Sequence, residues 1–308
     1  MTVRFPPRLR KGDMLGVISP ASPPQEHARI ARGVAYLLDQ GFQVRLGNSI
    51  GLRSGYLAGP DSVRVQDIHD MFLDDRVRGI VCTRGGYGSS RLLECIDWNL
   101  IKEHPKILVG FSDITALSLG LFANAGLVTF SGPMLATEFS SGMLPTVESA
   151  LYDQLMTPLP HRQLALGRNV EILRAGNAEG RLLGGNLSVF CSLIGTSYLP
   201  DLHDSVLFFE DVGEEVYRID RMLLQLKYAG ILEKAVGIVL GTFTSIPNTL
   251  QDRRIEDVFE EYLLSLNIPV LMGAAFGHIS EKITLPVGAR VLLEAGKRKL
   301  SVLDQVVT

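Results

Sequence analysis

The sequence predicts an α/β protein in two parts, an N-terminal, mostly parallel sheet flanked by helices and a strand-rich C-terminal α/β domain. Two observations carry this prediction. Over the first half, short apolar runs alternate with longer amphipathic segments, which is the pattern of strands joined by crossover helices. Near residues 157–168 two prolines and several polar residues interrupt that pattern, and beyond them apolar runs typical of strands become more frequent.

The first half is expected to contain five strands and four helices. The apolar runs that indicate strands lie at residues 14–19, 42–46, 79–82, 107–110 and 127–130. Apolar residues at three- and four-residue spacing indicate helices at 28–39, 61–73, 89–96 and 113–125. Gly41 and Gly126 follow two of these helices, where a glycine commonly ends a helix. A mostly parallel sheet of this kind binds ligands at the carboxyl ends of its strands.

The second half is expected to be richer in strands. Apolar runs indicate strands at 206–209, 236–241, 270–273 and within 283–303, whereas helices are expected at 216–228 and 255–266. We therefore divide the chain into an N-terminal domain of residues 1–156, a linker of residues 157–170 and a C-terminal domain of residues 171–308. A length of 308 residues is compatible with this division.

Composition excludes several classes of protein. The net charge is −3 with both signs interspersed, which gives no electrostatic footprint for nucleic acid or an acidic membrane. Cys82, Cys95 and Cys191 are odd in number and widely spaced, so neither a disulfide framework nor a zinc site is expected. The apolar stretch at 14–19 is too short for a signal peptide, and no run has the length of a membrane span. We expect a cytoplasmic protein without a metal or cofactor.

One serine lies at a tight corner between a strand and a helix. The segment Lys-Ile-Leu-Val-Gly-Phe-Ser-Asp-Ile-Thr, which starts at Lys106, places Ser112 on that corner. A nucleophile elbow has the same layout, with the next backbone N–H, here of Asp113, pointing toward the attacked carbonyl oxygen. Gly-Phe-Ser-Asp departs from the G-x-S-x-G motif of the common hydrolases. The alternative is that Ser112 only caps the following helix.

A nucleophilic serine needs a base and a third group that orients the base. His278 leaves an apolar strand through the small residues Gly-Ala-Ala-Phe-Gly and is expected at a cleft, unlike the five other histidines, which have polar neighbours. Glu210 comes directly after the apolar run at 206–209, where a carboxylate is costly unless it has a partner. Its alternative role, capping the helix that starts near Val216, suits the acidic residues after it better.

A glycine-rich turn, Thr-Arg-Gly-Gly-Tyr-Gly-Ser-Ser from Thr83, follows the strand at 79–82. Its backbone N–H groups suit an anion, although its spacing matches neither a P-loop nor G-x-G-x-x-G. In a parallel sheet, this turn and the Ser112 corner both lie at carboxyl ends of strands. They are therefore expected to form opposite walls of one oxyanion pocket.

Several motifs, in order, resemble those of the LD-carboxypeptidase family: Arg-Gly-Gly-Tyr-Gly, Gly-Phe-Ser-Asp-Ile-Thr, Gly-Gly-Asn-Leu, Phe-Glu-Asp-Val-Gly-Glu with a later Tyr-Arg-Ile-Asp-Arg-Met-Leu, and Gly-His with a later Leu-Pro-Val-Gly. The resemblance runs nearly from end to end. It implies an α/β nucleophile domain and a strand-rich C-terminal domain that meet at a cleft. It also implies that such proteins are often homodimers.

The resemblance implies a role for each matching residue. Ser112 matches the nucleophile, His278 the general base and Glu210 the carboxylate that orients the histidine. Gly86 and Asp113 match the backbone donors of the oxyanion hole. The implied reaction releases a terminal D-amino acid, typically D-alanine, from the diaminopimelate of a muropeptide tetrapeptide during cell-wall recycling, which makes a small peptide the expected partner.

The glycine-rich turn supplies the remaining candidate residues for substrate binding. Arg84 is expected to attract the terminal carboxylate of the substrate, because a guanidinium binds a carboxylate through two hydrogen bonds. The alternative for Arg84 is a structural ion pair. Tyr87 either lines the mouth of the site or packs the turn, and Gly85 and Gly88 complete the predicted binding loop.

Two other functions stay open. Relatives within the family hydrolyse peptidyl or aminoacyl nucleotides and so confer immunity to a microcin-type antibiotic. Such a substrate requires stacking groups for a nucleobase, and the single tryptophan, Trp98, together with the lack of a long extra loop near 181–186, favours the muropeptide. The other possibility is a non-enzymatic α/β protein that binds an anion at residues 84–88.

Overall fold

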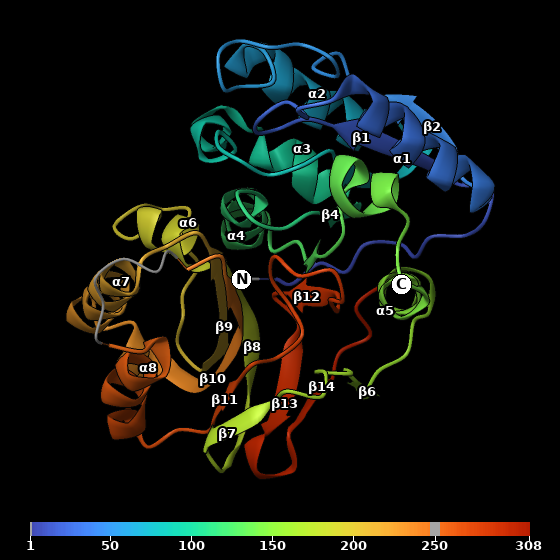
Figure 1. The fold of residues 1–308 in the computed structure, drawn as a ribbon. Helices are drawn as coiled ribbons and strands as arrows, with labels where there is room; N and C mark the ends of the chain where they lie inside the picture. The colour runs from blue at the N-terminus through green and yellow to red at the C-terminus, as the bar shows by residue number, and fades with distance from the viewer. Residues whose placement is uncertain (1, 247–252) are drawn as a thin grey trace.

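The computed structural model describes residues 2–246 and 253–308 and is organised around two sheets (Figure 1). The six-stranded sheet has the order β12 (Leu285–Val287), β5 (Thr129–Ser131), β4 (Ile107–Val109), β3 (Val77–Cys82), β1 (Met14–Ile18) and β2 (Gln43–Leu46). The eight-stranded sheet has the order β6 (Arg162–Gln163), β14 (Lys299–Val302), β13 (Arg290–Glu294), β8 (Asn177–Asn186), β9 (Ser205–Val212), β10 (Ala235–Thr244), β11 (Val270–Met272) and β7 (Glu171–Arg174). The predicted fold class, an α/β protein in two parts, is confirmed.

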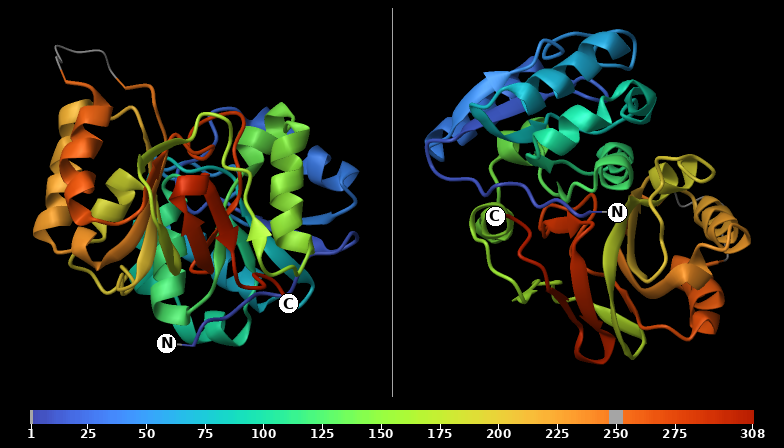
Figure 2. Two further views of the ribbon diagram at one scale, coloured as in Figure 1. Left: turned by 90° about the horizontal axis from the view of Figure 1, so that it is seen from below. Right: turned by 180° about the vertical axis from the view of Figure 1, so that it is seen from behind.

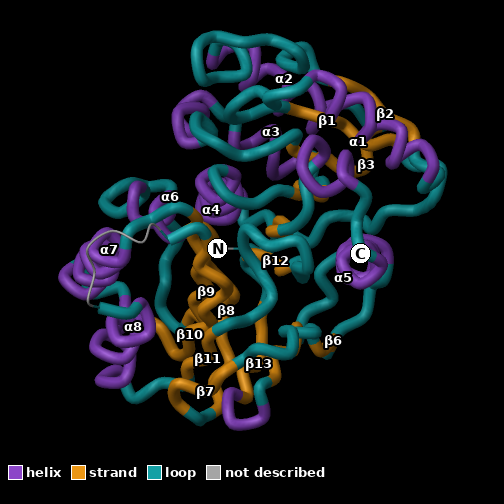
Figure 3. Tube along the Cα trace, viewed as in Figure 1, coloured by secondary structure: helices purple, strands orange, loops and turns teal. Residues whose placement is uncertain are grey.

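In the first sheet, β1 to β5 all run parallel, as the alternating pattern predicts. The helices that connect or flank these strands are α1 (His27–Asp39), α2 (Asp61–Leu73), α3 (Trp98–Glu103) and α4 (Ile114–Ala125). The second sheet is mixed: β8 to β11 are parallel, and antiparallel strands extend it on both sides. In Figures 1 and 3 the helices α6 (Leu187–Ser192), α7 (Val216–Tyr228) and α8 (Ile255–Leu263) stand together along one side of this sheet.

The segment predicted as a helix at residues 89–96 is helical, but it forms a 3-10 helix, η1 (Ser90–Cys95), and not an α-helix, and α3 begins only at Trp98. The reason is local: the carboxylate of Asp97 accepts hydrogen bonds from the N–H groups of Asn99 and Leu100 and so starts a new helix. At the other end of this segment, the N–H and the hydroxyl of Ser89 bond to Asp113, while the carbonyl of Ser89 accepts the N–H of Leu92, three residues on, as in a 3-10 helix.

Helix α4 lies between the two sheets (Figures 1 and 2). Nearly all of its residues are buried, which fits its sequence, because a helix that is apolar all round must be covered on every side. Gly126, with φ 67°, ends it in the left-handed conformation that favours glycine. Ser112 lies two residues before α4. Because α4 is packed between the two sheets, Ser112 lies at their junction.

Strand β12 crosses from the second half of the chain into the first sheet. It pairs antiparallel with β5, with Pro286 opposite Phe130. The loop that contains His278 therefore has β11 of the second sheet before it and β12 of the first sheet after it. The domain boundaries proposed from the sequence stay a prediction, and β12 is the segment that departs from a simple division into consecutive halves.

The remaining elements cover the sheets. They are η2 (Leu135–Phe139), a single π-helical turn after β5, α5 (Pro145–Met156), and the 3-10 turns η3 (Leu232–Lys234), η4 (Leu264–Leu266) and η5 (Ala295–Lys297). Cys82 and Cys191 are buried free thiols, and Cys95 is an exposed one. Among residues 2–246 and 253–308, none of the helices has the length and apolar character that crossing a bilayer requires.

Candidate active site

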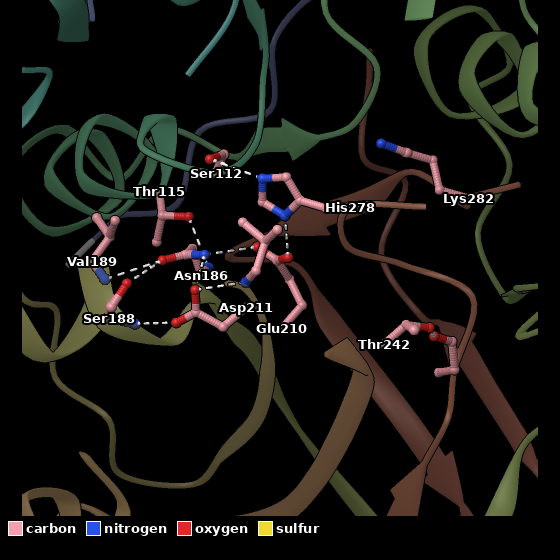
Figure 4. A network of polar contacts seen from close by, with 12 residues as sticks. Ser112, Thr115, Asn186, Ser188, Val189, Glu210, Asp211, Thr242, His278 and Lys282 are labelled. Atoms are coloured by element: carbon pink, nitrogen blue, oxygen red, sulfur yellow. Dashed lines mark hydrogen bonds and ion pairs between the residues drawn. The ribbon is translucent and has the colours of Figure 1, made fainter. Parts of the chain in front are cut away.

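Ser112 lies on the corner between β4 and α4 and has a strained backbone. Its φ of 63° is rare for a residue other than glycine and recurs at functional turns. Its hydroxyl lies 3.1 Å from Nε2 of His278, and α4 receives no side-chain cap from the residue before it. The helix-cap alternative therefore does not describe this hydroxyl, which points across the junction to the other sheet (Figure 4).

The two ring nitrogens of His278 connect the two sheets. Nδ1 lies 2.7 Å from Oε2 of Glu210, while Nε2 faces Ser112 (Figure 4). The side chain of Glu210 is buried, as is its whole strand up to Asp211. Glu210 lies within β9, two residues before the strand ends, and not just beyond the strand as expected, because β9 continues its pairing with β10 through Val212.

The structure thus brings together the three side chains that the sequence singled out. The carboxylate of Glu210 can hold the Nδ1–H tautomer of His278, which leaves Nε2 free to accept the proton of the Ser112 hydroxyl. The ring of Phe111, next to Ser112 in the chain, packs beside the imidazole with 4.9 Å between ring centroids. The five other histidines are exposed or half-buried, as predicted.

Asn186 is a site residue whose role the sequence reasoning missed. Its Nδ2 donates to Oε1 of Glu210 at 3.3 Å and to Asp211 at 2.9 Å, and its backbone N–H donates to Oγ1 of Thr115 in α4 at 3.0 Å (Figure 4). It also caps α6 by accepting from the N–H of Val189. The Gly-Gly-Asn-Leu motif was the available signal, but its spacing does not indicate that the amide reaches Glu210.

Asp211 belongs to the same network of hydrogen bonds. Its carboxylate accepts hydrogen bonds from the N–H groups of Ser188 and Val212 in addition to the amide of Asn186. Burial raises the pKa of Asp211 despite these hydrogen bonds. The neighbouring carboxylates of β9 share the amide of Asn186 but differ in their other partners: Glu210 faces His278, and Asp211 holds the start of α6.

The glycine-rich turn stands against the Ser112 corner, as predicted. A Cβ atom built on Gly85 would lie 2.9 Å from Oγ of Ser112 and 3.1 Å from the backbone N of Asp113. Gly85 therefore keeps open the space directly beside the hydroxyl. Among the described residues, no acceptor takes a hydrogen bond from the N–H of Gly86 or of Asp113. Both donors are available to a bound oxyanion.

The carboxylate of Asp113 ties the turn to the corner. It accepts a hydrogen bond of 2.8 Å from the N–H of Ser89, and the hydroxyl of Ser89 donates to the carbonyl of Asp113. Burial raises the pKa of Asp113, an effect that hydrogen bonds from Ser89 and Gly88 oppose. Gly88, with φ 128°, also presents its carbonyl to the buried guanidinium of Arg64 at 2.9 Å.

Arg84 and Tyr87 lie on the outer side of this turn. Within the described residues, the guanidinium of Arg84 makes no ion pair and donates one long hydrogen bond of 3.3 Å to the carbonyl of Pro23. Burial lowers the pKa of Arg84, and the charge of nearby Arg53 lowers this pKa further. The structural ion pair proposed as an alternative for Arg84 is therefore not formed. Tyr87 is exposed and makes an edge-to-face contact with Tyr56.

Two adjoining hollows extend from Arg84 to His278. One, of about 210 Å³, is bordered by Arg84 and the segment 24–25, and the other, of about 520 Å³, is bordered by Phe111, His278 and Lys282. Both share Arg29 and Thr137 in their walls. Together they provide a cleft with an apolar side, formed in part by residues 143–144, whose walls also include Arg84, Arg29 and the paired side chains of Lys282 and Glu138.

Comparison with known proteins gives consistent matches along most of the chain. Residues 15–132 match the model of the LD-carboxypeptidase N-terminal domain, and residues 179–293 match that of the LD-carboxypeptidase C-terminal domain. A probable murein peptide carboxypeptidase of Bacillus subtilis is 40% identical over 295 residues, which cover 95% of this chain and 92% of the relative.

Solved structures match over nearly the whole fold. The muramoyltetrapeptide carboxypeptidase from Oxalobacter formigenes superposes with a TM-score of 0.83 at 29% identity and covers 94% of this chain and 97% of its own. The microcin C7 self-immunity protein MccF, in complex with glutamyl sulfamoyl guanosine, superposes with a TM-score of 0.92 at 27% identity and covers 99% of both chains.

Proposed function

The chain belongs to the LD-carboxypeptidase family of serine-type hydrolases, and on this premise we propose that it releases the terminal D-alanine from muropeptide tetrapeptides in peptidoglycan recycling. One observation carries the proposal: the hydrogen-bonded series Glu210, His278 and Ser112, which spans two sheets and ends at a strained corner. A cytoplasmic location and a homodimer belong to the same proposal; the first rests on the cysteine pattern and the short apolar runs, and the second on the family resemblance.

The proposed reaction proceeds through an acyl-enzyme. Oγ of Ser112 attacks the carbonyl carbon of the scissile L,D-bond while Nε2 of His278 takes its proton, and Glu210 stabilises the imidazolium that forms. His278 then protonates the nitrogen of the leaving D-alanine, and the C–N bond breaks. In the second half, water attacks the ester carbon, His278 takes the proton of the water, and the ester oxygen returns to Ser112 as a hydroxyl.

The backbone N–H groups of Gly86 and Asp113 are proposed to stabilise the tetrahedral intermediates. The missing side chain of Gly85 leaves room between the turn and Oγ of Ser112, where the carbonyl oxygen would become negatively charged. Asp113 supports this arrangement twice, since its N–H faces the oxyanion and its carboxylate holds the opposite wall through Ser89. A substrate carbonyl would then meet donors fixed before it binds.

Arg84 is proposed to bind the terminal carboxylate of the substrate. In a carboxypeptidase this carboxylate lies one Cα atom beyond the scissile nitrogen, so its receptor must stand close to the oxyanion hole. Nη2 of Arg84 lies 3.6 Å from the Cβ position of Gly86, and its guanidinium has no carboxylate partner among the described residues. A half-buried guanidinium without a counter-charge gains most from an anionic ligand.

Replacing Arg84 with Met separates charge recognition from chemistry. We expect KM for a free-acid tetrapeptide to rise about 10- to 100-fold, the range for a charged hydrogen bond, while the C-terminal amide of the same peptide loses much less. Steady-state kinetics on both peptides measure the ratio. Arg91, whose side chain pairs with Asp61, offers a control substitution in the segment after the turn. Equal losses on acid and amide would contradict the assignment.

The reaction itself is tested by mass-spectrometric detection of D-alanine after incubation with a diaminopimelate-containing tetrapeptide. We expect release by the unaltered protein, no release by Ser112→Ala and no cleavage of an all-L peptide of the same composition. Release that persists in Ser112→Ala would refute the serine mechanism. A folded protein that leaves the tetrapeptide intact would refute the substrate assignment and favour the second candidate function below.

A second candidate is the hydrolysis of an aminoacyl or peptidyl nucleotide. It is favoured by the superposition on MccF and by Tyr56 and Tyr87, an exposed aromatic pair with 5.5 Å between ring centroids beside the binding loop. Trp98 does not contribute, because it packs against Tyr198. Incubation with a glutamyl sulfamoyl nucleoside, followed by mass spectrometry of the free nucleoside sulfamate, distinguishes the two substrates. The muropeptide assignment predicts that the tetrapeptide is cleaved far faster.

A further inference from the structure

Lys282 is a buried cation that the proposed reaction does not use. Its side chain is 3% exposed, and it lies four residues after His278 in the loop between β11 and β12. In Figure 4, Lys282 and Asn186 stand on opposite sides of His278. Asn186 contacts Glu210, which in turn holds His278 from one side. The contacts of Lys282 hold the loop of His278 from the other side.

Both partners of Lys282 belong to the first sheet and its connections. Nζ lies 2.6 Å from Oε1 of Glu138, a residue of the π-helical turn η2, and 3.9 Å from the ring centroid of Phe111. The carboxylate of Glu138 also accepts hydrogen bonds from Thr137 and from the N–H of Met134. Burial alone would raise the pKa of Glu138, but Lys282 and these donors outweigh it and lower the pKa, so the carboxylate is held ionised.

Phe111 connects these contacts to the reacting groups. It precedes Ser112 directly in the chain, and its ring packs against both the imidazole of His278 and the ammonium of Lys282. The loop therefore leaves the second sheet, places His278 beside Phe111, and returns to the same ring four residues later. The backbone closes this turn by a hydrogen bond of 2.8 Å from the N–H of Ile283 to the carbonyl of Ala275.

A buried ion pair is an uncertain source of stability, because the cost of removing two charges from water offsets their attraction. Here the ammonium of Lys282 meets both the carboxylate of Glu138 and the ring of Phe111, which restricts where its side chain can lie. We propose that Lys282 is a positioning residue: its ion pair with Glu138 and its cation–π contact with Phe111 hold His278 at hydrogen-bonding distance from Ser112 across the two sheets. The proposal rests on the proposed function of Ser112 and His278.

The test measures the nucleophile without a peptide substrate. A small fluorophosphonate reacts when Oγ of the serine attacks phosphorus, fluoride leaves, and the histidine takes the hydroxyl proton. Peptide mapping identifies Ser112 as the labelled residue, and the rate reports how well His278 activates it. For Lys282→Met we expect labelling and kcat to fall together, about 10- to 100-fold, the scale of a misplaced catalytic group, while KM changes less than about twofold.

Matched variants separate positioning from a general loss of structure. Lys282→Arg keeps the charge and the contact with the ring, so it is expected to restore most of the rate. The double variant Lys282→Met/Glu138→Gln leaves no buried charge without a partner and is expected to fold with the same labelling defect as the single variant. Lys106→Met removes another buried lysine, which bonds to the carbonyls of Met71 and Asp74, and should label at the normal rate.

Two results would overturn the proposal in distinguishable ways. Normal labelling and normal kcat in Lys282→Met, or in the folded double variant, would show that Lys282 does not position His278 while leaving the proposed function intact. Failure of the folded, unaltered protein to be labelled at Ser112 would contradict the serine mechanism itself. Labelling of Ser112 bears on both results, the kinetics of tetrapeptide cleavage supply kcat and KM, and circular dichroism checks folding.

Discussion

The two sheets supply the candidate active site in different ways. The first sheet contributes Ser112 through local geometry, because ten consecutive residues contain the strand, the strained corner and the start of α4. The second sheet contributes Glu210 and His278 through long-range pairing, with β9 and the loop after β11 brought together across β10. The geometry of the nucleophile is thus set within one segment, whereas its activation depends on how the two sheets pack together.

This difference explains where the polar networks lie. Around Ser112 most contacts come from the backbone and from the glycine-rich turn, which approaches closely at Gly85, while Ser89 and the carboxylate of Asp113 join the turn to the corner. Around Glu210 and His278 they come from side chains, among them Asn186, that must each be held by others. Changes on the second-sheet side should therefore act through geometry and protonation, and changes on the first-sheet side through space and the available N–H donors.

The largest effect on the second-sheet side is expected from Glu210→Gln. The amide can present an N–H to Nδ1 of His278 and so favours the wrong tautomer, which should lower kcat by about 10⁴-fold while the fold persists. Steady-state kinetics of tetrapeptide cleavage measure this loss. Asp211→Asn is the matched control, because its carboxylate holds the start of α6 and not the histidine. Asp211→Asn should lower Tm but reduce kcat far less than Glu210→Gln does. A larger loss of kcat in Asp211→Asn than in Glu210→Gln would contradict the roles given to the two carboxylates.

An intermediate effect is expected on the first-sheet side from Gly85→Ala. The new Cβ would lie 2.9 Å from Oγ of Ser112 and fill the space proposed for the oxyanion, so kcat should fall about 10²- to 10³-fold. Neither Gly85 nor the control Gly296 has a positive φ, and a Cβ on Gly296 meets nothing closer than 3.8 Å. Gly296→Ala should therefore leave kcat unchanged. Full activity of Gly85→Ala would mean that the oxyanion lies elsewhere.

The smallest effect is expected from Asn186→Ser, which sharpens the comparison within the second sheet. Serine still caps α6 but is too short to reach Glu210, so the cap, worth about 1 kcal/mol, is kept while kcat falls about tenfold. Thermal unfolding measures whether the cap of α6 is kept, and steady-state kinetics measure the loss of kcat. A variant with a normal kcat would show that Glu210 needs no support from the amide.

The same comparison shows how much could be predicted from the sequence. The parallel strands of the first sheet, the cap at Gly126 and the Ser112 corner follow from periodicity and turn residues, which are local signals. Glu210 and His278 are candidate partners of Ser112 because they follow apolar runs, and the family resemblance implies the specific role of each. That pairing depends on contacts 68 and 166 residues apart in the chain.

Other features lay beyond local signals. Strand β12 has three residues and contains Pro286, so its pairing with β5 depends on the two sheets meeting. The contact between Lys282 and Glu138 joins residues 144 positions apart, and each alone reads as an ordinary surface charge. Apolar spacing does not distinguish the 3-10 helix η1 from a short α-helix, whereas the hydrogen bond from the N–H of Leu92 to the carbonyl of Ser89, three residues back, is of the 3-10 type.

The measurement that tests the central claim most directly is the mass of the enzyme during turnover. A diaminopimelate-containing tetrapeptide is mixed with the unaltered protein, quenched in acid within the first turnover, and mapped after digestion. We predict that the acyl group is found on Ser112, and that it forms far more slowly in Glu210→Gln. D-Alanine release without an adduct on Ser112, together with undiminished release by Ser112→Ala, would contradict the account.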